Sequence, residues 1–384
     1  MRIAIVTETF VPATDGICTR FAKMVVELKK LGHEVIVISP DLGIDEYEGI
    51  PVFRMDTLTF PLYGSRPWGV PSRKIKYILK AFKPDIVHAV NPFFMGTSAV
   101  RYAKQLNLPL ITSYHTHMPN YLDHYKMPLL KPLLWEYIRF WYQPSDINIT
   151  VSQTLLEELN QQNIETVGVL PSGIDLDNRH PKYFDQALYD QLTFNQTDKK
   201  LLVYVGRLAA EKDLDQLRVI FDHRDDICLV IVGDGPEREN LEALFEGTPT
   251  TFLGFLHGEE LSKAFATGDA FIFPSISETY GLVISEAMAS GLPVFAAKNG
   301  PTLEQITDKE TGFIFESRNT ESLMTALKQL DNPLLLEKVR IAALKQAESH
   351  SWNNATRSLL DYYDLTLEAY QRNQSIALQE TINF

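Results

Sequence analysis

The sequence predicts an α/β protein made of two doubly wound parallel-sheet domains that face a central cleft. Short apolar runs alternate with amphipathic stretches along the chain. The runs are continuously apolar, as in strands buried on both faces of a parallel sheet. The pattern restarts after a polar, weakly periodic stretch around 177–200, and a chain of 384 residues has room for two domains of ordinary size.

The first half opens with a strand expected at Ile3–Thr7, followed by a helix with apolar residues at helical spacing from Ile17 to Leu31. Gly32 stands directly after this helix, where a C-cap glycine belongs. Apolar runs predict further strands at 35–39, 85–90, 108–113, 146–151 and 167–170. We therefore expect a first domain over residues 1–174.

The second half repeats the alternation, and we expect a second domain over residues 175–361. Its strands are expected at 201–205, 228–232, 251–253, 270–273, 293–297 and 312–315. The stretch from Trp352 to about Arg372 predicts one helix. Open parallel sheets bind ligands beyond the carboxyl ends of their strands, so the ligand is expected in a cleft between the two domains.

Composition and charge exclude several classes of protein. The net charge is −13, yet residues 1–180 hold 18 basic and 18 acidic side chains, so the whole negative excess lies in 181–384. An acidic chain is not expected to bind nucleic acid, which favours a basic surface. The two cysteines, Cys18 and Cys228, have no neighbours at zinc-ligand spacing, and no metal site is expected. Without a signal peptide or a membrane-spanning run, a cytoplasmic protein is expected.

The most informative segment is 277–293, SETYGLVISEAMASGLP. It places Glu278 in a loop and Glu286 eight positions later, in a helix expected to begin near Gly281. Eight helical residues rise about 12 Å, close to the separation of the sugar and the ribose in a nucleotide sugar. Carboxylates accept hydrogen bonds from the vicinal hydroxyls at both ends. The alternative is a surface helix with two incidental glutamates.

Backbone amides and two cations near this segment suit a diphosphate. The amides of Tyr280, Gly281 and Leu282 would lie at the positive end of the helix. In YVGRLAAEK, Arg207 and Lys212 follow a strand end and could neutralise a leaving group without a metal. Alternatively, Arg207 forms a surface ion pair and Lys212 is solvated.

Two first-half segments are candidates for the same ligand. The loop TFVPATDGI brings Gly16 to a helix start without a GxGxxG fingerprint, and a simple turn capped by Asp15 explains it equally well. In SYHTH, His115 ends a strand and could contact a sugar hydroxyl, although a structural role is as common for such a histidine. VGDGP, which ends the strand at 228–232, is explained as a turn.

Together these blocks resemble the retaining family-4 glycosyltransferases, and the resemblance covers most of the chain. It rests on TETFVPATDG, SYHTH, GRLAAEK, VGDGP, FLGFL and the Glu278–Glu286 spacing. Several blocks are most similar to sulfoquinovosyl diacylglycerol synthases and bacterial diacylglycerol glycosyltransferases. Two departures, at Tyr280 and in the segment 299–302, leave the transferred sugar less defined than the fold.

The resemblance implies the GT-B fold, with two Rossmann-like domains, and a metal-independent hexosyltransferase that needs no cofactor. The donor would be a UDP-sugar (UDP-sulfoquinovose or UDP-glucose) and the acceptor diacylglycerol or a related membrane lipid. The last helix, about 362–384, would pack back on the first domain. The implied contacts are Arg207 and Lys212 with the diphosphate, Glu286 with the ribose, Glu278 and His115 with the sugar, Gly16 with the phosphates, and Leu256 and His257 with the base.

A basic, aromatic region of the first half favours a membrane surface. Residues 66–83 carry six cations and no acidic residue, interleaved with aromatic and aliphatic side chains, and 118–142 adds further aromatic and basic residues. This composition suits a peripheral protein on the anionic inner face of the cell membrane. The alternative is a helix packed on the sheet with an ordinary solvated face.

Three other functions remain open at this point. A glucosyl or mannosyl transferase could use another envelope lipid or a soluble acceptor. A nucleotide-sugar epimerase could share the two-domain fold, but it would need acids and bases in the cleft that move a proton. A sugar-binding relative without catalysis is the third, and the complete set of donor-site residue types argues against it.

Overall fold

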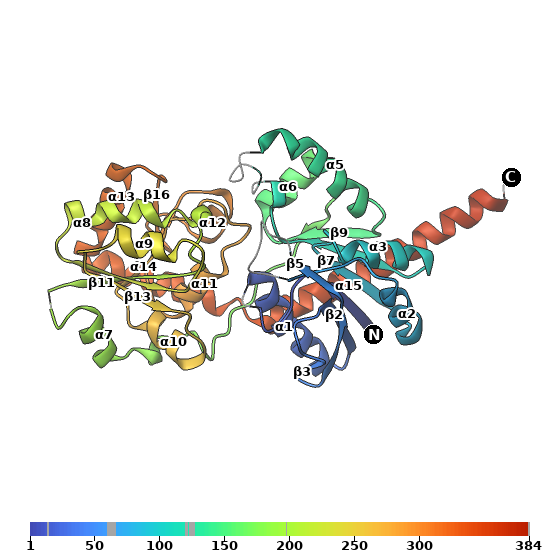
Figure 1. The fold of residues 1–384 in the computed structure, drawn as a ribbon, viewed down its shortest axis with the longest axis horizontal. Coiled ribbons are helices and arrows are strands. Elements are labelled where there is room, and N and C mark those ends of the chain that lie inside the picture. Colours follow the sequence, from blue (N-terminus) through green and yellow to red (C-terminus); the bar gives the residue numbers. More distant parts are fainter. Residues whose placement is uncertain (14, 60–66, 120–121, 123–126, 197, 383–384) are drawn as a thin grey trace. The chain divides into compact units, whose positions relative to one another are not determined.

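In the computed structural model the chain forms two compact units, Met1–Gly173 with Trp352–Phe384, and Ile174–Ser351 (Figure 1). The structure describes residues 1–13, 15–59, 67–119, 122, 127–196 and 198–382. The chain returns to the first unit at Trp352, earlier than the predicted residue 362. Trp352, Leu359 and Tyr363 of helix α15 (Trp352–Ile382) are buried in the core of that unit, which explains the earlier return.

The first unit is built on an eight-stranded sheet with the order β10-β9-β8-β7-β1-β2-β4-β3. All neighbours are parallel except β3 and β4. A separate hairpin joins β5 (Thr57–Thr59) and β6 (Pro67–Gly69). The strands of the sheet are β1 (Arg2–Thr7), β2 (Glu34–Pro40), β3 (Glu46–Tyr47), β4 (Ile50–Met55), β7 (Ile86–Val90), β8 (Leu110–Tyr114), β9 (Ile147–Thr150) and β10 (Gly168–Val169).

Both faces of this sheet are covered, as the continuous apolar runs predict. Alternate residues of β1 point to opposite sides, because side chains alternate along a strand. Ile3 and Ile5 join a core with α1 (Gly16–Lys30) and α15, whereas Ala4 and Val6 join a second core with α2 (Lys74–Phe82) and α3 (Gly96–Gln105). The first unit also contains η2 (Pro128–Leu130), α5 (Lys131–Tyr142) and α6 (Gln153–Gln161).

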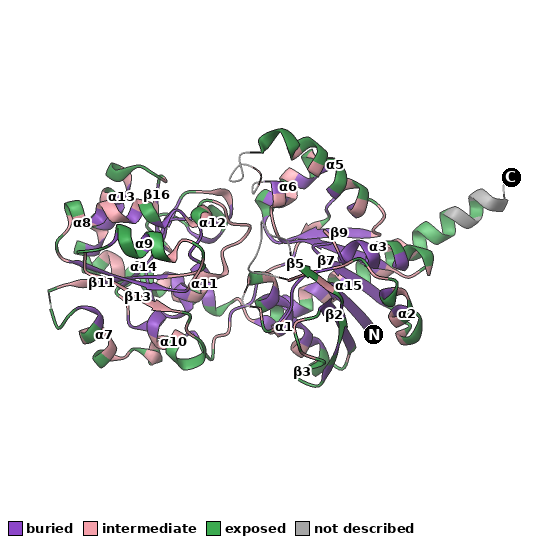
Figure 2. Ribbon diagram, in the orientation of Figure 1, coloured by how far each residue is buried: buried purple, intermediate pink, exposed green. Residues whose placement is uncertain are grey.

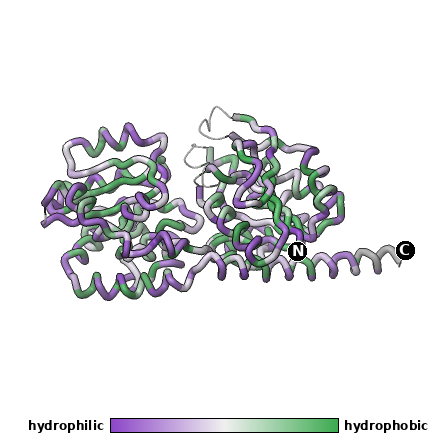
Figure 3. Tube along the Cα trace, turned by 90° about the horizontal axis from the view of Figure 1, so that it is seen from below, coloured by the Kyte–Doolittle hydropathy of each residue, from purple (hydrophilic) through white to green (hydrophobic). Residues whose placement is uncertain are grey.

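The second unit has a six-stranded parallel sheet with the order β13-β12-β11-β14-β15-β16. Most of its strands are buried inside a shell of partly exposed helices (Figure 2), and in Figure 3 hydrophobic stretches (green) alternate with hydrophilic ones (purple) along the trace. The strands are β11 (Lys200–Val205), β12 (Ile227–Val232), β13 (Thr250–Gly254), β14 (Ala270–Phe273), β15 (Val294–Ala297) and β16 (Phe313–Phe315). The α-helices are α7 (Gln186–Leu192), α8 (Ile220–His223), α9 (Arg238–Leu244), α10 (Gly258–Ala266), α11 (Leu282–Ala289), α12 (Gly300–Gln305), α13 (Thr320–Leu327) and α14 (Pro333–Glu348), and the 3₁₀ helices are η3 (Pro181–Tyr183), η4 (Ala210–Lys212), η5 (Leu214–Val219) and η6 (Lys328–Asp331).

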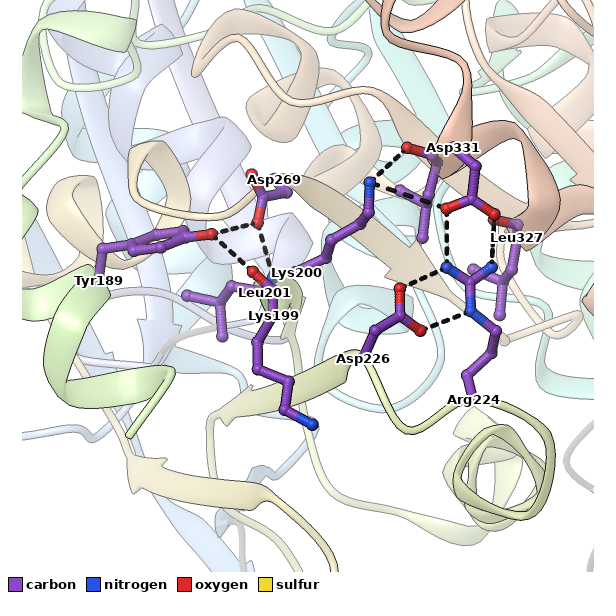
Figure 4. A network of polar contacts seen from close by, with 10 residues as sticks. Tyr189, Lys199, Lys200, Leu201, Arg224, Asp226, Asp269, Leu327 and Asp331 are labelled. Atoms are coloured by element: carbon purple, nitrogen blue, oxygen red, sulfur yellow. Dashed lines mark hydrogen bonds and ion pairs between the residues drawn. The ribbon is translucent and has the colours of Figure 1, made fainter. Parts of the chain in front are cut away.

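A network of charged side chains closes the amino ends of the strands in the second unit (Figure 4). Arg224 binds both Asp226, before β12, at 2.6 Å and Asp331 at 2.9 Å. The guanidinium lowers the pKa of the Asp226 carboxyl. Lys200, the first residue of β11, donates to the Leu330 carbonyl at 2.7 Å. These contacts stabilise one end of the sheet and leave the carboxyl ends of the strands for a ligand.

Candidate active site

The strand order of the second unit locates its binding edge. The chain runs from β11 outward through β12 and β13, then returns to β14 beside β11 and continues outward on the other side. β11 and β14 therefore flank the topological switch point, where doubly wound sheets bind ligands beyond the carboxyl ends of the strands. Arg207 and Lys212 follow β11, and Glu278 follows β14, so these three predicted site residues come from the two loops at this point.

The two loops are joined by an ion pair. Lys212 Nζ binds Glu278 Oε1, and both side chains are largely buried, with exposed fractions of 18% and 14%. Next to this pair, Ser277 Oγ donates to the Glu211 carbonyl at 2.7 Å. Arg318 also holds the β11 loop, with ion pairs to Asp213 at 2.5 Å and Asp215 at 3.0 Å. The predicted phosphate-binding lysine and the predicted sugar-binding carboxylate are thus direct neighbours.

Arg207 has a different partner. Its guanidinium pairs with Glu211 one helical turn later, and nearly half of its side chain is exposed. This is the surface ion pair that the sequence left open as an alternative. A ligand with a diphosphate would have to draw Arg207 away from Glu211.

The helix of the Glu278–Glu286 segment begins where the sequence predicts, next to Gly281, but it covers less of the interval between the two glutamates than the spacing argument assumes. α11 starts at Leu282, so only half of the interval between the two glutamates is helical. Gly281 precedes it with a φ of 84°, a left-handed conformation that favours glycine. Gln305 donates to the carbonyl of Tyr280 and accepts from Ser285 Oγ at 2.7 Å, which fixes the start of the helix. The helical rise of about 12 Å therefore does not apply to this pair of glutamates.

Glu286 has a partner that the sequence analysis missed. Arg179 Nε lies 3.2 Å from Glu286 Oε1, and the guanidinium stacks 5.0 Å above the centre of the Phe265 ring. Arg179 is 9% exposed and also contacts Ser262 Oγ at 3.4 Å. It stands before the β11 strand, remote in sequence from α11, and no motif of the chain links the two. The contact orients the carboxylate expected to bind the ribose.

Glycines let neighbouring strand-end loops approach closely in the second unit. At Gly233, after β12, φ is 129°, and an added Cβ would lie 2.0 Å from the Gly206 carbonyl oxygen. The amide of Gly206 in turn donates to the Val232 carbonyl at 3.0 Å. The next loop, after β13, carries Leu256, which packs against the core, and His257, which precedes α10. The segment VGDGP is therefore a turn, as predicted.

In the first unit, the switch point lies between β1 and β7, and the loop after β1 leads to Gly16. Gly16 is the first residue of α1, and Asp15 caps this helix by accepting from the amides of Ile17 at 3.1 Å and Cys18 at 3.0 Å. Thr9 Oγ1 donates to the other Asp15 oxygen at 2.6 Å. Asp15 therefore holds the loop against the helix start, which is the capped turn that the sequence left open.

Glu8 is a second acidic residue of this loop, and the sequence analysis missed it. Its buried carboxylate accepts from the backbone amides of Phe93 at 3.1 Å, Phe94 at 2.8 Å and Gly96 at 2.8 Å, at the start of α3. Burial raises the pKa of Glu8 against the lowering effect of these amides. The contact ties the loop after β1 to the loop after β7.

His115 is buried at the end of β8, with 5% of its surface exposed. Its Nε2 lies 2.8 Å from Ser113 Oγ, and its backbone amide donates to Asn91 Oδ1 at 3.1 Å. Burial holds the pKa of His115 well below its usual value, so the ring is neutral. The neighbouring His117 instead binds Glu158 Oε2 at 2.6 Å.

The described part of the chain contains no group of three or more histidine, cysteine or acidic side chains placed to hold a metal ion. The switch point of the second unit brings together carboxylates, cations and close backbone turns. Doubly wound sheets bind anionic nucleotides at this carboxyl edge.

Comparison with known proteins identifies the family. Residues 14–178 match the model of Glycosyltransferase Family 4, and residues 186–346 match that of glycosyl transferases group 1. The chain is 34% identical to the sulfoquinovosyl transferase SQD2 of Arabidopsis thaliana over 90% of this chain and 69% of that protein. It is 31% identical to a GDP-mannose-dependent alpha-mannosyltransferase of Mycolicibacterium smegmatis, over 96% of this chain and 98% of the relative.

A third relative and a solved structure agree with this result. The chain is 29% identical to the alpha-monoglucosyldiacylglycerol synthase of Streptococcus pneumoniae, over 82% of this chain and 75% of the relative. The sucrose-phosphate synthase of Thermosynechococcus elongatus has the same fold, with a TM-score of 0.77, 18% identity, and coverage of 96% of this chain and 99% of that chain. The protein belongs to glycosyltransferase family 4 and has the GT-B fold. It is a retaining hexosyltransferase that uses a nucleotide sugar, in a family whose members are generally independent of metals.

Proposed function

We propose that the protein transfers a hexose from a UDP-sugar, UDP-sulfoquinovose or UDP-glucose, to diacylglycerol or a related membrane lipid. The observation that carries this proposal is the similarity to a sulfoquinovosyl transferase and to a monoglucosyldiacylglycerol synthase along most of the chain. One relative is named for the transfer of sulfoquinovose and the other for a glucosyl diacylglycerol product, and together these names support a glycolipid product. The enzyme would work as a peripheral protein on the inner face of the cell membrane.

The donor roles are assigned to residues of the second unit. Lys212 and Arg207 would bind the diphosphate together with the amides of Tyr280, Gly281 and Leu282. Glu278 would bind the transferred sugar. Glu286 would bind the ribose, because a carboxylate accepts hydrogen bonds from a vicinal hydroxyl pair, and the contact with Arg179 holds this carboxylate in place.

The remaining donor contacts are assigned by the family resemblance. Leu256 and His257 would meet the base. In the first unit, Gly16 would approach the phosphates and His115 the sugar.

The acceptor surface is assigned to η2 and α5 of the first unit. Three apolar side chains stand out from these helices, Leu129 at 92%, Leu133 at 69% and Phe140 at 65% exposure. Such side chains on an amphipathic helix suit insertion into the boundary between headgroups and acyl chains. None of the helices that the structure describes is long and apolar enough to span a membrane. We therefore propose reversible binding to an anionic membrane surface.

The basic segment 66–83 contributes charge to the same proposal. On α2, Ile75 and Leu79 are buried. The apolar face of this helix therefore packs on the sheet, as the alternative in the sequence analysis states. Lys74 pairs with Asp56 at 2.8 Å, and Tyr77 is exposed. The remaining cations of α2 would attract anionic lipids, each by about 1 kcal/mol near the surface. Arg66, and Tyr121, Tyr125 and Lys126 of the later segment, lie outside the described residues.

A donor and acceptor panel tests the function. The protein is incubated with vesicles that contain diacylglycerol and with UDP-sulfoquinovose, UDP-glucose, UDP-galactose or GDP-mannose. The products are identified by mass spectrometry. A hexosyl diacylglycerol from a UDP-sugar is the expected result. A mannolipid formed only from GDP-mannose would instead support a mannosyltransferase, the activity in the name of the relative with 31% identity. Products on soluble acceptors alone would reject the lipid acceptor.

A further inference from the structure

A buried chain of hydrogen bonds connects helix α15 to His115 inside the first unit. Tyr363 Oη lies 2.9 Å from His88 Nδ1, and His88 Nε2 lies 2.7 Å from Ser113 Oγ. Ser113 Oγ lies 2.8 Å from His115 Nε2. Tyr363, His88 and Ser113 are fully buried, so water does not compete for these bonds. The three bonds join the last helix, β7 and β8 in one line.

The direction of each bond follows from the tyrosine. A buried hydroxyl proton needs an acceptor. Among the described residues, His88 Nδ1 is the one hydrogen-bond partner of Tyr363 Oη, so the tyrosine donates and Nδ1 accepts. Burial lowers the pKa of His88 to about 3, so its ring is neutral and carries its single proton on Nε2. His88 therefore donates to Ser113 Oγ, and Ser113 donates in turn to His115 Nε2.

This order fixes the tautomer of His115. Because Nε2 accepts, the neutral ring carries its proton on Nδ1. Within the described part of the chain, Nδ1 of His115 has no hydrogen-bond partner. This atom is not fully enclosed by the protein, because it is absent from the buried polar atoms that lack a partner. The free donor of His115 is thus Nδ1–H.

We propose that Tyr363, His88 and Ser113 are positioning residues that hold His115 as an Nδ1–H donor toward an oxygen of the bound sugar. The sugar contact rests on the proposed function, whereas the tautomer belongs to the protein alone. Without the tyrosine hydroxyl, His88 could carry its proton on either nitrogen, and the chain could reverse. His115 would then present an acceptor to the same sugar oxygen.

The ¹⁵N shifts of histidine side chains test the tautomer directly in the ligand-free, full-length protein. Proteins labelled at the ring nitrogens are compared, and the signals of His88 and His115 are assigned with His88→Gln and His115→Gln. Protonated Nδ1 and accepting Nε2 at His115 are expected, with the opposite pattern at His88. A protonated Nε2 at His115 would overturn the proposal, whatever the donor or acceptor of the enzyme proves to be.

Tyr363→Phe and Tyr362→Phe form a matched pair. Tyr362 is the neighbouring residue on α15 and donates to the Val169 carbonyl at 3.1 Å, outside the chain of bonds. Tyr363→Phe should give both tautomers at His115 and lower kcat about tenfold, the equivalent of one hydrogen bond. Tyr362→Phe should keep the wild-type tautomer and kcat. Equal effects of the two variants on the His115 shifts would contradict the positioning role. If Tyr363→Phe fails to fold, the His115 tautomer in the wild-type protein still tests the proposal.

Discussion

Lys212 and Glu278 form an ion pair although they come from different strand-end loops of the second unit. Each therefore neutralises the charge of the other before a donor binds. In the proposed donor roles, a diphosphate would compete with Glu278 for the lysine, and a sugar would compete with Lys212 for the carboxylate. A nucleotide sugar would offer both groups at once and so replace both partners of the pair, whereas UDP alone would replace only Glu278.

Glu278→Gln should separate turnover from nucleotide binding. Loss of the carboxylate removes a contact to the transferred sugar, and kcat should fall by about 100-fold or more. UDP should bind as well as before or more tightly, because Lys212 no longer pairs with a carboxylate. Steady-state rates and calorimetry with UDP measure the two effects. Glu316→Gln, which removes an exposed partner of Lys298, is the control. Wild-type turnover in Glu278→Gln would show that the assignment of this residue is wrong.

Arg179→Met should destabilise the protein. It leaves the Glu286 carboxylate partly buried without its guanidinium, and the free energy of unfolding should fall by about 2 kcal/mol. Urea denaturation measures the change. The matched control is Arg340→Met, whose exposed pair with Glu337 should cost less than about 0.5 kcal/mol. Equal losses in the two variants would argue against a structural role of the Arg179–Glu286 contact.

Gly233→Ala should damage the site loop far more than Gly32→Ala. Both glycines have a positive φ, but a Cβ at Gly32 meets nothing within 4 Å, whereas a Cβ at Gly233 would lie 2.0 Å from the Gly206 oxygen. Gly32→Ala should cost about 1 kcal/mol of backbone strain. Gly233→Ala must also move the Gly206 loop, and we expect UDP binding to weaken at least tenfold. Unchanged UDP affinity in Gly233→Ala would exclude this loop from the donor site.

Acid should weaken the first unit through His88. Burial lowers the pKa of His88 to about 3, against about 6.5 in an unfolded chain. Between these values the unfolded chain binds a proton that the folded chain does not, so the free energy of unfolding falls as the pH falls below 6.5. The slope is about 1.4 kcal/mol per pH unit for one histidine. His88→Gln should have a shallower slope between pH 6 and 4, whereas the exposed His223→Gln should match the wild type.

Leu129→Glu with Leu133→Glu should reduce membrane binding. Both side chains are exposed, so the fold should tolerate the change, while the inserted apolar surface becomes charged. When the double variant is sedimented with anionic vesicles at low salt, most of the protein that binds in the wild type should stay in the supernatant. Leu334→Glu, at an equally exposed leucine of α14, is the control. If neither variant loses binding, the membrane surface lies elsewhere; if the wild type does not bind at all, the membrane proposal fails.

The sequence predicted the buried strands of both sheets because their residues are apolar on both faces. It missed β4, where Pro51 and Arg54 interrupt the apolar run. It placed the start of α11 correctly near Gly281 but treated all eight residues from Glu278 to Glu286 as helical, although the first half of that interval is a loop.

Local sequence patterns were sufficient to locate those site residues whose motif follows a predicted strand. Glu278 and Lys212 were placed at strand ends from the sequence, and both lie there. Arg179 and Glu8 were not found, because their partners lie far away in the chain. Glu8 belongs to the motif TETFVPATDG, but the motif does not reveal its contact with the start of α3. Contacts of this kind depend on how the strands are ordered, which spacing alone does not give.

The position of α15 has a consequence for synthesis on the ribosome. The second unit is continuous in sequence and can complete its core as soon as Ser351 has emerged. The first unit also needs Trp352 and Tyr363, which follow the second unit in the chain. The residues that precede Ile174 would therefore complete their core only after the whole second unit has been translated, and His115 would obtain its hydrogen-bonded chain only once Tyr363 has emerged.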